Sequence, residues 1–168
     1  VITIQLSGTQ SGATHPAHIH ANSAAEVGGI ILDLTPVNGA DGKSETVVGA
    51  MNDGTAVSYE DLLSIDGYVN VHQSATDLAT LIAQGDIGQN ALTGNEKVYT
   101  LTPVADPNVS GTATFAERKN GQTLVTVDLE NTQPGASHPS HIHANTIAEG
   151  GGIVINLKNV DGTSGMAS

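Results

Sequence analysis

The feature of the sequence that most limits the fold is an internal repeat. When residue 15 is aligned with residue 138, an offset of 123 residues holds without a gap, and 22 of the 45 aligned positions are identical. A period of this length matches the size of one domain and is far longer than a solenoid repeat. The sequence therefore predicts two related units, with one full period and 45 further residues in the chain.

Each predicted unit lacks one segment of the repeat, and the other unit contains that segment. The first unit, residues 1–94, has no copy of residues 95–123, and the second, residues 95–168, has no copy of residues 46–94. Two explanations stay open: the sequence is a window of a longer tandem array, or neighbouring repeats or chains supply strands to one another. Which unit residues 46–94 complete is also open, but both explanations predict self-assembly with neighbouring repeats or chains.

Short segments with alternating apolar and polar residues predict an all-β fold. Asn-Gly and Asp-Gly pairs, which favour tight turns, separate these segments and indicate an antiparallel sandwich or barrel. The predicted strands are residues 1–6, 30–34, 46–51, 68–72, 98–101, 111–115, 123–129 and 153–157. Residues 58–63, with Ser58 as the N-cap, are predicted to form a short helical turn, and residues 74–84 to begin with another.

The composition excludes several classes of partner and site. Seventeen acidic and five basic residues give a formal net charge of −12, which repels nucleic-acid phosphates and anionic lipid headgroups. No apolar run approaches the roughly 20 residues of a membrane-spanning helix, so we expect neither nucleic-acid binding nor membrane insertion. The chain has no cysteine, and any bound metal must therefore have nitrogen or oxygen ligands.

Six of the seven histidines occur in two copies of one phrase, HPAHIHAN at residues 15–22 and HPSHIHAN at residues 138–145. Residues two apart on a strand face the same side. His18 and His20 are therefore predicted to project together, while Ile19 faces the core.

The other histidines fall into two groups. His15 precedes the pair by three residues, so it either joins the pair as a ligand or braces the loop by hydrogen bonding. The same alternatives apply to His138 in the second copy, where His141 and His143 form the matching pair. The seventh histidine, His72, ends a predicted strand from which it can supply a third ligand.

Three imidazoles without sulfur suit copper or zinc and leave a fourth position for water or a small ligand. The plainer alternative is that the histidines decorate the surface or form hydrogen bonds within loops. A metal site is favoured because the phrase occurs twice with its flanking residues. The Asp/Asn/Gly turns lack the ligand spacing of a calcium-binding EF-hand and are predicted to serve as turns only.

Four segments in this order resemble the CHRD domain family: HPAHIHAN, GGIILDL, DGYVNVHQSA and LIAQGDIG. CHRD domains are β-sandwich modules found in chordin and in many secreted bacterial proteins, so the resemblance implies a secreted or cell-surface, bacterial location. The similarity covers essentially the whole chain, with residues 95–168 resembling the first part of a following tandem copy. CHRD domains in turn look like relatives of the copper-zinc superoxide dismutase sandwich, which implies a Greek-key topology.

The resemblance to the dismutase implies His18, His20 and His72 as copper-type ligands and His15 as a bracing residue. His141 and His143 are the matching pair. Departures from the enzyme are equally clear, because its bridging and zinc-site histidines and its disulfide cysteines have no counterparts. The only arginine lies at position 118, and no motif places it near the histidines.

Three functions remain in competition. The first is a secreted or cell-surface structural module that assembles into an array or filament and binds copper, or alternatively zinc, through its histidine clusters. The second is a copper-only superoxide dismutase, although a chain of net charge −12 repels an anionic substrate. The third is an adhesion or spacer module without metal. We expect the first, and so a protein that is not an enzyme.

Overall fold

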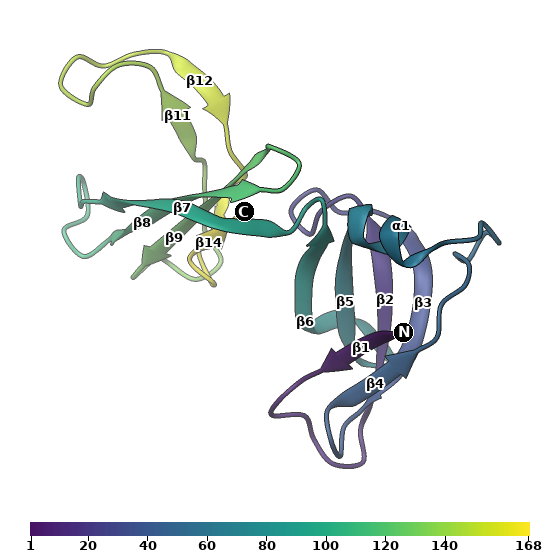
Figure 1. Cartoon of the computed structure of the whole chain (residues 1–168). Coiled ribbons are helices and arrows are strands. Elements are labelled where there is room, and N and C mark those ends of the chain that lie inside the picture. Colours follow the sequence, from purple (N-terminus) through teal and green to yellow (C-terminus); the bar gives the residue numbers. More distant parts are fainter. The chain divides into compact units, whose positions relative to one another are not determined.

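The computed structural model describes residues 1–168, which divide into two compact units, Val1–Leu92 and Thr93–Ser168 (Figure 1). Antiparallel strands make up nearly all of the regular secondary structure of each unit. This confirms the predicted all-β, antiparallel class. None of the helical structure is long and apolar enough to cross a bilayer.

The first unit contains a six-stranded antiparallel sheet in the order β1-β4-β3-β2-β5-β6, and the sheet is curled (Figure 1). Its elements are β1 (Ile2–Gln5), β2 (Thr14–Ala21), β3 (Ile30–Asn38), β4 (Lys43–Thr46), α1 (Tyr59–Ser64), β5 (Asp66–Ser74) and β6 (Asp77–Gly88). The histidine phrase forms β2, which is a central strand because β3 and β5 pair with its two edges.

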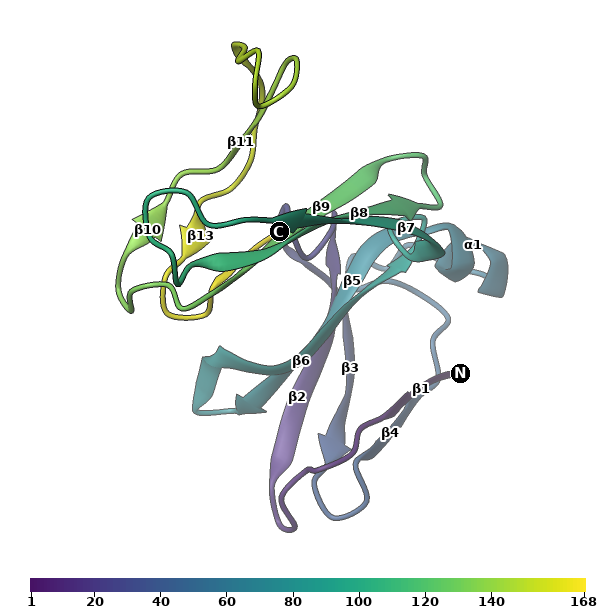
Figure 2. The same ribbon diagram turned by 90° about the vertical axis from the view of Figure 1, so that its left-hand side faces the viewer.

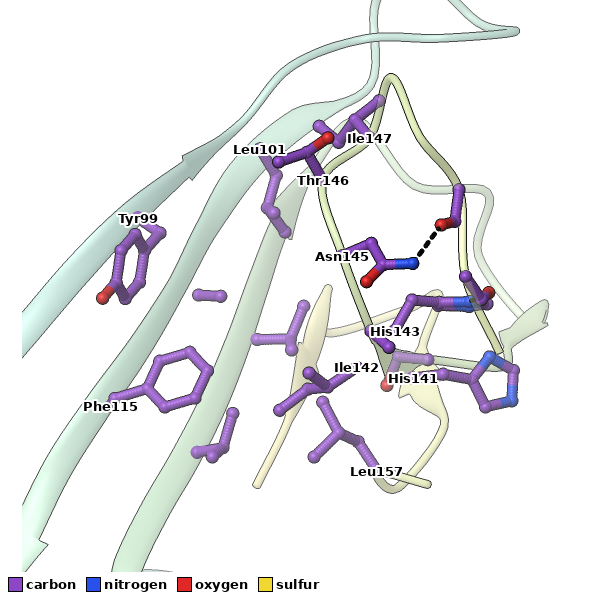
Figure 3. Close-up of a pocket in the computed structure, with 17 residues that line it drawn as sticks. Tyr99, Leu101, Phe115, His141, Ile142, His143, Asn145, Thr146, Ile147 and Leu157 are labelled. Atoms are coloured by element: carbon purple, nitrogen blue, oxygen red, sulfur yellow. Dashed lines mark hydrogen bonds between the residues drawn. The ribbon is translucent and has the colours of Figure 1, made fainter. Parts of the chain in front are cut away.

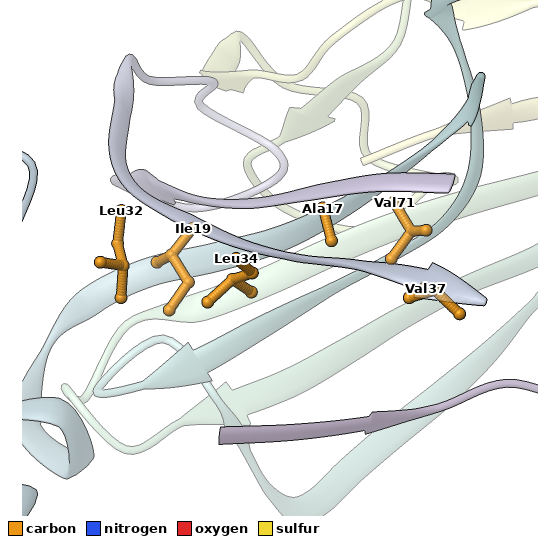
Figure 4. Close-up of a cluster of buried hydrophobic side chains, with 6 residues drawn as sticks. All are labelled: Ala17, Ile19, Leu32, Leu34, Val37 and Val71. Carbon is orange, nitrogen blue, oxygen red and sulfur yellow. The ribbon is translucent and has the colours of Figure 1, made fainter. Parts of the chain in front are cut away.

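The core of the first unit lies along β2, β3 and β5. Ala17 and Ile19 of β2 are fully buried, and Val71 of β5 is 2% exposed. Together with Leu32, Leu34 and Val37 of β3 they form one cluster (Figure 4). Burial of each large aliphatic side chain contributes ~1.5–3 kcal/mol, so the cluster fixes which face of β2 is internal. A shift by one residue would put the histidines in the core.

The second unit has one four-stranded sheet and two separate strand pairs. The sheet order is β14-β9-β8-β7, and the pairs are β10-β13 and β11-β12 (Figures 1 and 2). The strands are β7 (Leu92–Leu101), β8 (Ser110–Arg118), β9 (Thr123–Glu130), β10 (Ser137–His138), β11 (His141–His143), β12 (Ile153–Asn156), β13 (Val160–Asp161) and β14 (Met166–Ala167). The second histidine phrase is thus divided between β10 and β11, where the first forms one continuous strand.

The repeat is visible in the strand register. Gln5 of β1 lies opposite Lys43 of β4, and at an offset of 123 Asp128 of β9 lies opposite Met166 of β14. The two units differ on the other edge of these strands. β9 pairs there with β8, whereas β1 is the outermost strand of its sheet.

The predicted helical turn at residues 58–63 is confirmed as α1. Ser58 caps the helix, since its hydroxyl accepts a hydrogen bond from the Asp61 backbone N–H at 3.1 Å. The Asp61 carboxylate in turn accepts one from the Ser58 N–H at 2.9 Å. This reciprocal capping box satisfies backbone donors that the helix itself leaves unpaired.

Two local predictions are wrong. Residues 74–84 contain no helical turn, because the segment forms most of β6, which pairs with β5 from Asp66 to Ser74. The hydroxyl of Ser74 accepts from the Asp77 N–H at 3.1 Å and so closes a tight turn rather than a helix. The predicted strand at residues 46–51 ends at its first residue, because the pairing of β4 with β1 ends at Thr46.

Candidate metal centre

Histidines from two neighbouring strands meet in the first unit. His18 and His20 lie on β2 and His72 lies on β5, which pairs with β2. One ring nitrogen from each of the three lies within 4.8 Å of the other two. Ile19 between the pair is 1% exposed and belongs to the core. The sequence therefore predicted correctly which side of β2 faces the interior.

Backbone carbonyls set the orientation of two of the rings. His20 Nδ1 lies 2.8 Å from the Gly28 carbonyl oxygen, and His72 Nδ1 lies 2.7 Å from that of Leu78. A carbonyl only accepts hydrogen bonds, so each Nδ1 carries the proton and each Nε2 presents a lone pair. Metal-binding histidines are commonly held in this way by a carbonyl on the nitrogen remote from the metal.

His18 uses its other nitrogen. Its Nδ1 lies 3.1 Å from Nε2 of His72, while its Nε2 faces Asp33, with 3.8 Å between Nε2 and the carboxylate. Two nitrogens bound to one tetrahedral zinc at 2.0–2.1 Å are about 3.3 Å apart. The spacing of His18 and His72 thus fits ligands that share an ion, and Asp33 lies where it can orient the His18 ring.

The surroundings favour the neutral, metal-binding form of His18. Burial lowers the pKa of His18, and the neighbouring His72 and His20 lower it further, against an opposing effect of Asp33. His20 Nε2 is buried and has no hydrogen-bond partner. Buried polar atoms rarely stay unsatisfied, and a cation bound by the three imidazoles would satisfy this one. The donor set, three nitrogens without sulfur, fits copper or zinc.

Two residues that the sequence analysis did not single out hold His20 in place. Tyr68 stacks on the His20 ring with 4.9 Å between centroids, and its hydroxyl accepts a hydrogen bond from the Gly28 N–H at 3.1 Å. A Cβ at Gly28 would come within 2.0 Å of the Ala21 carbonyl oxygen. The signal for Gly28 is present in the repeat, where Gly151 occupies the same position and meets Ala144 in the same way.

His15 lies outside the cluster of three. It is 3% exposed, and its Nδ1 lies 2.9 Å from the Gln73 carbonyl oxygen and 3.2 Å from that of His72. The side chain therefore ties β2 to the end of β5 beside His72. The sequence left two roles open for His15, metal ligand or bracing residue, and this geometry suits a bracing residue.

The second histidine phrase forms a pair and not a cluster of three. His141 and His143 have ring centroids 6.0 Å apart, close to the 6.1 Å between His18 and His20. His143 Nδ1 lies 2.9 Å from the Gly151 carbonyl oxygen, as in the first copy. Both rings are exposed, and β11 pairs only with β12. His138, the counterpart of His15, is half-buried with an unpartnered Nε2.

Comparison with protein families gave a match, whereas comparison with curated proteins and with solved structures found none. Residues 1–77 match the CHRD domain, a range that includes β1 to β5 and all three clustered histidines. The predicted second copy and the likeness to superoxide dismutase stay predictions. The match supports the CHRD family for the part of the chain that holds the candidate metal centre.

Proposed function

We propose that the protein is a secreted or cell-surface, bacterial structural module whose first unit binds one copper or zinc ion through His18, His20 and His72. One observation carries this proposal: three imidazole nitrogens converge, and carbonyls hold two of the rings with their Nε2 lone pairs toward the cluster. The CHRD match supports an extracellular location, since domains of this family are typically extracellular.

Metal at this position would act on the structure. His18 and His20 belong to β2 and His72 to β5, so a shared ion would cross-link two central strands of the sheet. A ligand that binds only the folded state stabilises it, by about 2.7 kcal/mol at a free concentration 100 times its Kd. Copper would bind more tightly than zinc on the general order of affinities for nitrogen ligands.

Dismutase activity has weaker support. Arg118, the only arginine, belongs to β8 and is 4% exposed. A formal charge of −12 opposes the approach of an anion. The structural role therefore fits the chain better than superoxide chemistry does.

A specific observation favours assembly as well. β1 repeats β9 in register, yet β9 has β8 on the edge where β1 has no strand. Exposed strand edges accept strands from other chains. We include in the proposal that units complete one another across copies, as in an array or filament.

Titration of the metal-free chain with Cu(II) and with Zn(II), followed by calorimetry, tests the metal site. The expected result is one tight site per chain, lost in His72→Ala and kept in Gln73→Ala, a matched change at the next residue of the same strand. His141→Ala/His143→Ala is expected to keep the site. Equal binding by His72→Ala and the unchanged protein would refute the proposal.

Sedimentation velocity on the same samples tests assembly. We expect association of the unchanged chain. A monomer at all concentrations, with and without chelator, would refute this part of the proposal and leave the metal site standing.

A further inference from the structure

The second unit repeats the strand pairing of β2, except that one of the two paired strands is missing. In the first unit, β2 has β3 on one edge and β5 on the other. In the second unit, β11 has β12, the counterpart of β3, and no strand on its other edge. The missing neighbour is the strand that in the first unit carries His72.

Apolar side chains are also more exposed in the second unit, which has no copy of residues 46–94. Leu32 of β3 is 5% exposed, but Ile155 at the same position of β12 is 52% exposed. Ile19 is buried, whereas its counterpart Ile142 is half-buried. Val37 and its counterpart Val160, at 0% and 1%, are buried alike. The difference is therefore local to the part of the repeat around β11 and β12.

Ile142, though not Ile155, lines a groove of about 830 Å³ within the second unit. Its walls include Tyr99, Phe115, Val125, Ile142 and Leu157. Figure 3 shows Ile142 and Leu157 directed toward the sheet that carries Tyr99 and Phe115, while the His141 ring points away from it. In Figures 1 and 2 the β11-β12 hairpin stands clear of the sheet β14-β9-β8-β7. An apolar groove beside an open strand edge is a site for strand addition.

The accepting edge already has the conformation found in the completed unit. Asn145 has φ 65° and Asn22 has φ 68°, and each donates a side-chain hydrogen bond across its loop, to Gly150 and Val27 respectively. His143 makes the same carbonyl contact as His20. Binding would therefore require little rearrangement of β11, which favours affinity.

We propose that β11 and this groove bind a β-hairpin with the chemistry of residues 66–88, the segment that forms β5 and β6. In the first unit, Ile19 lies opposite Val69, and His20 lies opposite Tyr68. Transferred by the offset of 123, this register places Val69 opposite Ile142 and Tyr68 opposite His143. The third imidazole, at the position of His72, would then join His141 and His143, and this last step alone rests on the proposed metal function.

The experiment uses a fluorescent synthetic peptide of residues 66–88 added to the full chain. With chelator present we expect saturable one-to-one binding and none with a scrambled peptide. Residues 66–88 contain three aspartates and no lysine or arginine, and the chain has a charge of −12, so affinity is expected to rise with salt. Added Cu(II) or Zn(II) is expected to tighten binding at least about tenfold, by linkage of metal and peptide.

Two matched sets of variants locate the site. Ile142→Asp is expected to abolish peptide binding, while Val104→Asp, the same change at a 98% exposed loop position, is expected to leave it unchanged. His141→Ala/His143→Ala, which replaces two exposed rings, is expected to keep binding in chelator and lose the gain from metal. Circular dichroism and the metal titration of the first unit check that each variant is folded.

The outcomes separate this inference from the proposed function. If the first unit binds metal but the peptide does not bind in chelator, the acceptor site is refuted and the metal centre stands. If the peptide binds in chelator and metal binds nowhere, the acceptor site is upheld and the metal function fails. Binding that is equal for Ile142→Asp and the unchanged chain would overturn the placement in the groove.

Discussion

Nδ1 of His18 lies 3.1 Å from Nε2 of His72, although 54 residues separate the two in the sequence. The contact joins neighbouring strands of the sheet in the first unit, β2 and β5. With His72 Nδ1 bonded to the Leu78 carbonyl, His18 donates the proton of this contact in the metal-free protein. A metal ion would take the place of that proton at Nδ1, and the ring would then carry its proton on Nε2, which faces Asp33.

Metal is predicted to stabilise the fold through this contact. Zn(II) at 100 times its Kd is expected to add about 2.7 kcal/mol to the free energy of unfolding, measured by urea denaturation. Chelator is expected to reverse the effect, and His18→Ala to abolish it because a ligand is lost. The same stabilisation in His18→Ala would show that zinc acts elsewhere.

His15 is predicted to stabilise the first unit without binding metal. In His15→Ala the Gln73 and His72 carbonyls lose their donor, at a cost of about 1–3 kcal/mol in unfolding free energy. His15→Asn keeps an N–H near the position of Nδ1 and is expected to recover part of this loss. Metal stoichiometry, measured by calorimetry on both variants, is expected to stay at one. A loss of the metal site in His15→Asn, with stability retained, would identify His15 as a ligand.

Val27 is predicted to strain the loop after β2. Its φ is 64°, in the left-handed region, whereas the second repeat has Gly150 with φ 67° at the same position. A side chain costs roughly 1–2 kcal/mol there, and glycine's greater freedom when unfolded offsets part of the gain. Val27→Gly is expected to raise the unfolding free energy by about 0.5–1 kcal/mol, and Gly150→Val to lower it. A decrease in Val27→Gly would contradict the strain.

The capping box of α1 is predicted to give a pH-dependent contribution to stability. Hydrogen bonds from the Ser58 backbone and hydroxyl lower the pKa of Asp61 below its ordinary 3.8. The unfolded chain therefore binds this proton at a higher pH than the folded chain does. The stabilisation is present above pH 3.8 and is lost as the pH falls through the folded pKa. Denaturation of the unchanged protein and Asp61→Asn at several pH values is expected to show a difference that shrinks below pH 3.8. A constant difference would contradict this origin.

The sequence predicted well where a local pattern and the tertiary fold agree. Alternation around Ile19 placed the two histidines of β2 on one side, because a buried aliphatic residue fixes the register of a strand. Ser58 followed by acidic residues predicted the start of α1, because capping depends on neighbours in the chain.

Prediction from the sequence failed where a segment distant in the chain determines the local structure. Ser74, Thr76 and Asp77 carry the residue types of a helix start, yet pairing with β5 makes the following residues a strand. The sequence also could not predict which ring nitrogen of each histidine faces the cluster. The choice depends on the carbonyls of Gly28, in the loop before β3, and of Leu78, at the start of β6, whose positions only the folded chain shows.

Anomalous diffraction from crystals of the full chain grown with Cu(II) or Zn(II) tests the central claim most directly. The account predicts one ion within about 2.0–2.1 Å of Nδ1 of His18, Nε2 of His20 and Nε2 of His72. An anomalous peak bound only at other residues, or His72 turned away from the ion, would contradict it.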